Sequence, residues 1–60
     1  MSGVADKYRT HIRELEAQRA REEKELKTAT DAQGRTTLAQ NIKALTGQIA
    51  EQKKRFAAMG

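Results

Sequence analysis

The middle of the chain reads Thr28-Ala29-Thr30-Asp31-Ala32-Gln33-Gly34-Arg35-Thr36, a run of poor helix formers that contains the glycine nearest mid-chain. Gly34 can adopt the left-handed conformation that ends many helices, and Thr37 followed by Gln40 has the spacing of a capping box. The run therefore predicts a turn at about 30–36, with one helix before it at about 4–29 and a second helix after it at about 37–58.

On both sides of this turn, apolar residues recur at alternating steps of three and four, which is the a/d spacing of a helical heptad. We call the two stripes together the seam. Its first half comprises Tyr8, Ile12, Leu15, Arg19, Glu22 and Leu26. Its second half comprises Leu38, Ile42, Leu45, Ile49, Gln52, Phe56 and Met59. The two halves are out of phase along the sequence, so one straight helix cannot present both on one side.

An antiparallel pair of helices would bring the two halves of the seam together. The residue numbers of facing partners then add up to 67 or 68, from Ala29 opposite Leu38 to Tyr8 opposite Met59. Each charged or polar seam residue faces an apolar one in this register. We therefore expect an all-α fold, a single domain over residues 1–60 that forms an antiparallel two-helix hairpin of the coiled-coil type. The alternative is one long helix, continuous or bent.

The composition indicates that such a hairpin has too little apolar material to form a core alone. The chain has 60 residues, of which 33% are charged, and ten of its apolar residues are alanine, which leaves twelve larger ones. With no cysteine there is no disulfide, so the usual reinforcement of a very small domain is missing. We expect pairing with a second copy, in a four-helix bundle, or binding to a partner.

Two features beside the seam are candidates for a partner face. Arg19 and Glu22, charged residues at the centre of the seam, are spaced to pair with each other and can cover Leu45 and Ile49 with their aliphatic stems. They are either a tolerated polar interruption or a device that sets register or partner. The second feature is a row of small residues in the second helix, formed by Ala39, Thr46, Gly47, Ala50 and Ala57. Such residues allow another helix to approach closely, although alanine is also the ordinary filler of an exposed helix surface.

The formal net charge is +4, and in the expected hairpin the cations gather at the open end, away from the turn. Six residues form this candidate anion-binding site: Lys7, Arg9, Arg13, Lys53, Lys54 and Arg55. A basic patch of this kind suits phosphates, an anionic membrane surface or an acidic protein. Complementation of the helix dipole at the end of the second helix is the competing explanation for the last three.

Nothing in the sequence indicates catalysis, and we expect no enzyme activity, no metal and no cofactor. His11 has no cysteine or second histidine with which to share a metal ion, and Gly34-Arg35-Thr36-Thr37 lacks the first glycine and the lysine of a phosphate-binding loop. The glutamates alternate with arginines and lysines, as on a solvated helix surface, and Glu23–Lys27 and Glu51–Arg55 have the favourable spacing for ion pairs.

These observations predict a protein–protein interaction module that serves as a small assembly or adaptor element. One alternative is a basic dimer that binds nucleic acid, comparable in outline with the small plasmid protein ROP, with which the chain shares length and hairpin shape but no motif. Another is a small secretion chaperone or co-exported partner. Because no apolar run approaches a membrane span and the first residues lack the features of a signal peptide, we expect a cytoplasmic protein.

Overall fold

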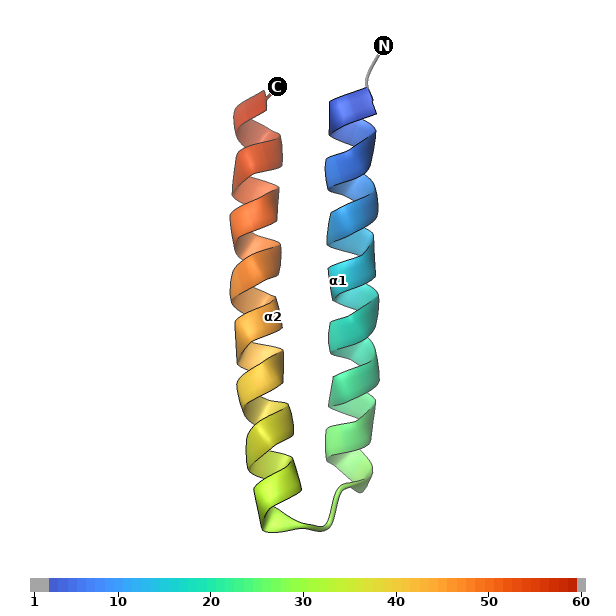
Figure 1. The fold of residues 1–60 in the computed structure, drawn as a ribbon, viewed down its shortest axis with the longest axis vertical. Helices are drawn as coiled ribbons and strands as arrows, with labels where there is room; N and C mark the ends of the chain where they lie inside the picture. The colour runs from blue at the N-terminus through green and yellow to red at the C-terminus, as the bar shows by residue number, and fades with distance from the viewer. Residues whose placement is uncertain (1–2, 60) are drawn as a thin grey trace.

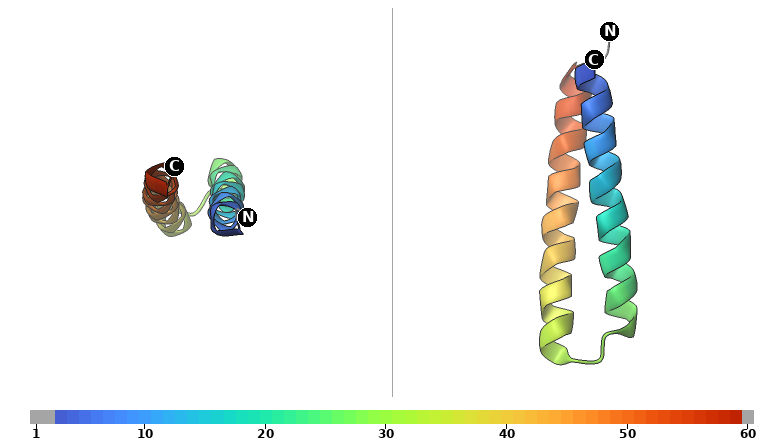
Figure 2. Two further views of the ribbon diagram at one scale, coloured as in Figure 1. Left: turned by 90° about the horizontal axis from the view of Figure 1, so that it is seen from above. Right: turned by 45° about the vertical axis from the view of Figure 1, so that its right-hand side comes forward.

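The computed structural model describes residues 3–59, which form two helices, α1 (Gly3–Thr28) and α2 (Ala32–Met59). The helices lie side by side and run in opposite directions, so the start of α1 and the end of α2 lie at the same end of the molecule (Figure 1). The hairpin measures 47 × 15 × 11 Å, and the views from above and from the side show one layer of two helices (Figure 2). The predicted all-α antiparallel hairpin is therefore confirmed.

The interior of the hairpin is a narrow strip along the seam. Among residues 3–59 four side chains are buried, those of Ile12, Leu15, Leu45 and Ile49, and Phe56 packs against them. Ile49 is the most buried of the four, at 3% exposed. The other seam residues are half-buried except Met59, which is 46% exposed at the end of α2. Burial is therefore deepest at Leu45 and Ile49, near the middle of α2.

The turn is shorter than predicted, and the second helix begins at Ala32 instead of about residue 37. The reason is that Asp31 caps α2. Its carboxylate Oδ2 accepts a hydrogen bond from the backbone N–H of Gly34 at 2.9 Å, and its carbonyl accepts one from the N–H of Arg35 at 2.9 Å. Aspartate is among the preferred residues for this position, because its side chain satisfies a free N–H of the first turn.

Two predictions about the turn are thus wrong. Gly34 does not end a helix in the left-handed conformation, since no glycine of the described residues has a positive φ, and it lies in the first turn of α2. Thr37 does not begin a helix through a capping box with Gln40, because the helix is already one turn long at that point. Asp31 is the residue that caps the start of α2, a role that the sequence pattern predicted for Thr37.

Arg35 secures the other side of the turn. Its Nη1 donates hydrogen bonds to the carbonyl of Leu26 in the last turn of α1, at 3.3 Å, and to that of Ala29 just after α1, at 3.0 Å. A cation is favourable here because the last carbonyls of a helix carry partial negative charge. One acidic residue at the start of α2 and one basic residue a turn later therefore satisfy the backbone groups on both sides of a three-residue connection.

Candidate interaction surface

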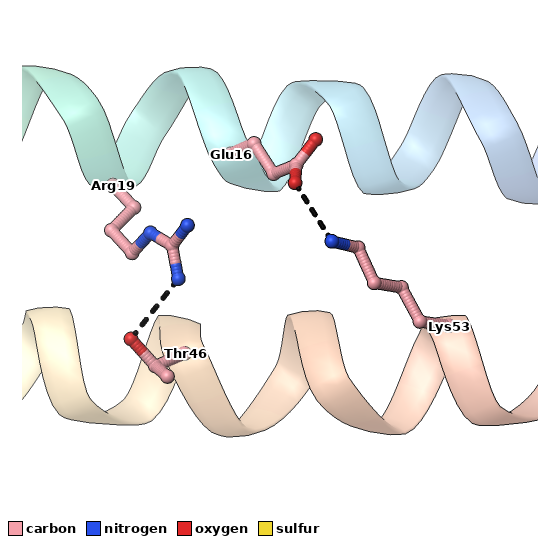
Figure 3. A network of polar contacts seen from close by, with 4 residues as sticks. All are labelled: Glu16, Arg19, Thr46 and Lys53. Carbon is pink, nitrogen blue, oxygen red and sulfur yellow. Dashed lines mark hydrogen bonds and ion pairs between the residues drawn. The ribbon is translucent and has the colours of Figure 1, made fainter.

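Two polar contacts between the helices show which flanks of α1 and α2 lie on the same side of the hairpin. Lys53 Nζ lies 3.1 Å from Glu16 Oε2, and Arg19 Nη1 donates a hydrogen bond of 3.4 Å to Thr46 Oγ1 (Figure 3). Their residue numbers add up to 69 and 65, on either side of the predicted 67 to 68. Helical spacing then assigns the residues outside the seam to the side of these contacts, to the opposite side, or to the outer side of each helix.

The side that carries these two contacts holds most of the positive charge, and we call it the basic face. It has seven cations and three carboxylates: Arg9, Arg13, Arg19, Lys27, Arg35, Lys43, Lys53, Asp6, Glu16 and Glu23. The opposite face has three cations and four carboxylates: Lys7, Arg21, Arg55, Glu14, Glu22, Glu25 and Glu51. Lys24 and Lys54 point outward from the two helices by the same spacing. The charge is thus divided around the hairpin as well as along it.

The six residues predicted to bind anions do not lie on one surface. Arg9, Arg13 and Lys53 belong to the basic face, whereas Lys7 and Arg55 belong to the opposite face and Lys54 points outward. Three of the six are also close to carboxylates of the chain: Arg9 to Asp6 at 3.8 Å, Lys53 to Glu16 at 3.1 Å, and Arg55 to Glu51 at 3.4 Å. The open end is therefore a weaker concentration of free positive charge than the count of cations indicates.

The predicted row of small residues lies mostly on the basic face. Ala39, Thr46, Ala50 and Ala57 are exposed there, and Gly47 is exposed beside them on the outer side of α2. A Cβ placed on Gly47 would meet no atom within 4 Å. The hairpin itself therefore leaves this part of α2 open, and α1 does not pack against it.

The central charged pair of the seam behaves differently from the prediction. Arg19 donates to Thr46 on α2, and no ion pair joins it to Glu22 among the described residues. Glu22 Oε2 is buried without a hydrogen-bond partner. The two side chains project to opposite faces of the hairpin, which explains why their spacing does not bring them together.

A shallow hollow of about 440 Å³ lies on the basic face near the turn. Leu26 and Ile42 supply its apolar lining, and Glu23, Lys27 and Arg35 surround it. Lys27 and the neighbouring Lys43 take part in no ion pair within residues 3–59. This hollow combines half-buried apolar side chains with cations that are available to a partner.

The opposite face has its own shallow hollow near the open end, of about 270 Å³, lined by Lys7, Tyr8, His11 and Gln52. His11 is exposed at its edge. Within residues 3–59 no group of three or more histidine, cysteine or acidic residues is placed to hold a metal ion. In the same part of the chain, neither helix is long and apolar enough to cross a membrane.

Sequence reasoning missed three residues that matter for this surface. Lys27 of α1 lines the hollow, Lys43 of α2 follows the lining residue Ile42, and Arg35 connects the hollow to the turn. The sequence did contain the information needed to find them. Once antiparallel packing is assumed, the heptad positions of the charged residues divide these residues between the basic face and the opposite face. Comparison with protein families, with curated proteins and with solved structures finds no match for the chain.

Proposed function

We propose that the chain is a non-enzymatic interaction module that binds another protein by packing of helices and so acts as an assembly or adaptor element. The observation that carries the proposal is the small interior. The hairpin exposes 4794 Å² of surface, whereas a compact protein of its mass exposes about 3,900 Å². Only four side chains of residues 3–59 are buried, so packing against a third or fourth helix would remove more apolar surface from water.

The placement of the ionisable side chains supports a binding role over catalysis. A general acid or base acts best when it is partly desolvated and held in a pocket. Here His11 is exposed, as are all of the carboxylates except the half-buried Glu16 and Glu22. Glu16 forms an ion pair with Lys53, and Glu22 lines neither of the two hollows.

Purification of the full chain from its own cells tests this function. The chain, carrying a short affinity tag and expressed at its natural level, should retain a partner protein in fixed stoichiometry after nuclease treatment and a wash at moderate salt. Ile49→Asp, which places a charge in the core, should lose this protein because the hairpin no longer forms. Failure to recover any protein in fixed proportion would contradict the proposal. Fractionation of the same cells tests the expected cytoplasmic location.

Nucleic-acid binding is the second candidate, and the charge surplus of the basic face favours it. Phosphates release counterions when they bind cations, so affinity would fall steeply with salt. A gel-shift assay with duplex DNA and with RNA, at low and at physiological salt, tests it. Tight binding that disappears on changing Arg13, Lys27 and Lys43 to glutamine would place this function first.

A further inference from the structure

The basic face brings together an apolar hollow and free cations. Leu26 and Ile42 are half-buried, and the hollow that they line is open to solvent. Lys27, which lines the hollow, and Lys43, which follows the lining residue Ile42, form no ion pair among the described residues. Within the hollow itself, Glu23 is outnumbered by Lys27 and Arg35. A partner that fits this arrangement has an apolar side chain for the hollow and acidic groups around it.

A second copy of the chain fits this face poorly. In a symmetric dimer the same surface occurs on both subunits, so each basic face would meet the other. Seven cations and three carboxylates would then oppose an identical set. Like charges brought together at an interface raise its free energy, whereas a net-acidic partner would lower it.

Nucleic acid fits the face less well than an acidic protein. Binding to single strands commonly depends on exposed aromatic rings, on which bases stack. The ring of Phe56 is packed against the core and lies beneath the guanidinium of Arg9, 5.5 Å from the ring centroid, and Tyr8 belongs to the opposite face. The carboxylates Glu16 and Glu23 also lie within the face, where they would oppose a continuous phosphate backbone.

We propose that the basic face is the docking surface for an acidic amphipathic helix of the partner, which lies along the two helices as the third helix of a bundle. The inference rests on the proposed function and adds the chemistry of the partner. An apolar residue of that helix occupies the hollow between Leu26 and Ile42, and its acidic residues meet Lys27 and Lys43. The exposed Ala39 and Ala50 allow its backbone to lie close to α2.

A synthetic peptide is the probe for this surface. It carries leucine at heptad a and d positions and glutamate at most others, and a second peptide replaces each glutamate with lysine. Titration into the full, isotope-labelled chain should shift the amide resonances of Leu26, Lys27, Ile42 and Lys43 with the acidic peptide. The basic peptide should not bind. Replacing the leucines of the acidic peptide with alanine should weaken binding, because nothing then fills the hollow.

Two double charge reversals distinguish an effect of the basic face from an effect of the net charge of the chain. Lys27→Glu combined with Lys43→Glu should weaken acidic-peptide binding by about tenfold or more. Lys24→Glu combined with Lys54→Glu makes the same change at two exposed lysines that point outward, one on each helix, and should weaken it by less than about threefold. Circular dichroism of both variants checks that the helices persist.

Three results would overturn the inference. Equal losses in the two double variants would mean that only net charge matters. Helical spacing places Gln18, Asn41 and Gln48 on the opposite face, so resonance shifts confined to these three residues would place binding there. If duplex DNA or RNA shifts the amide resonances of Lys27 and Lys43, and neither peptide does, the face would be assigned to nucleic acid. Equal losses in the double variants, or shifts on the opposite face, would contradict this inference but not the proposed function, provided that a protein still co-purifies with the native chain. Failure to recover any protein would contradict the proposed function itself.

Discussion

Gly34 occupies the first turn of α2 with ordinary helical backbone, so its lack of a side chain serves no conformational need. A Cβ at this position would lie 3.5 Å from Asp31 Oδ2 and 3.8 Å from Asp31 Cβ, which are ordinary contact distances. Gly34→Ala should therefore stabilise the hairpin by about 0.5 to 1 kcal/mol, because alanine loses less backbone entropy on folding. Urea unfolding followed by circular dichroism measures this change. A loss of stability would indicate the left-handed conformation instead.

Asp31 is the residue on which the start of α2 depends. Removal of its carboxylate by Asp31→Ala leaves the N–H of Gly34 without its 2.9 Å hydrogen bond and should lower the free energy of unfolding by about 1 kcal/mol. Thr30→Ala is the matched control at the preceding position, whose hydroxyl makes no hydrogen bond within the described residues, and it should change stability by less than about 0.5 kcal/mol. Equal effects of the two changes would contradict the capping role.

At the scale of the helices, stability comes from the short central part of the seam. Ile49→Ala removes methyl groups from the most buried position of the hairpin and should cost about 2 to 4 kcal/mol, a large share of the stability of so small a domain. Val4→Ala removes methyl groups from a side chain that is 60% exposed in the first turn of α1, and it should be nearly neutral. Thermal melting of the two variants at one protein concentration makes the comparison. A larger loss from Val4→Ala would mean that the ends of the helices hold the hairpin together.

At the scale of the whole molecule, self-association stays a prediction. The division of charge between the two faces predicts how the amount of dimer should change with salt concentration. Two basic faces repel each other at low ionic strength, and salt screens that repulsion. If copies pair through the alanine-rich side of α2, sedimentation should show more dimer at about 0.5 M salt than at about 0.05 M. More dimer at low salt would indicate an interface held by ion pairs between different faces, and a monomer under both conditions would contradict self-association.

The sequence predicted the hairpin and its seam because both depend on regular spacing. Apolar residues such as Ile12 and Ile49 repeat at steps of three and four, and because of their change of phase near Asp31 one straight helix cannot present both stripes on one side. The exact turn was not predictable in the same way, because Asp31, Thr37 and Gly34 each offer a plausible end or start of a helix. Local hydrogen bonds of similar energy decide between them, and here the carboxylate of Asp31 and the guanidinium of Arg35 satisfy the backbone groups on both sides.

By itself, then, the sequence determined that the chain forms two amphipathic helices with a thin apolar seam and an excess of positive charge. Only the tertiary structure decided where that charge lies. Residues such as Lys27 and Lys43 are distant in sequence and come to one face because antiparallel packing places particular flanks of α1 and α2 side by side, as the contact between Glu16 and Lys53 shows. The same packing covers Ile49 and leaves Gly47 open. The basic face consists of residues from both helices, so the spacing of residues within one helix does not define it.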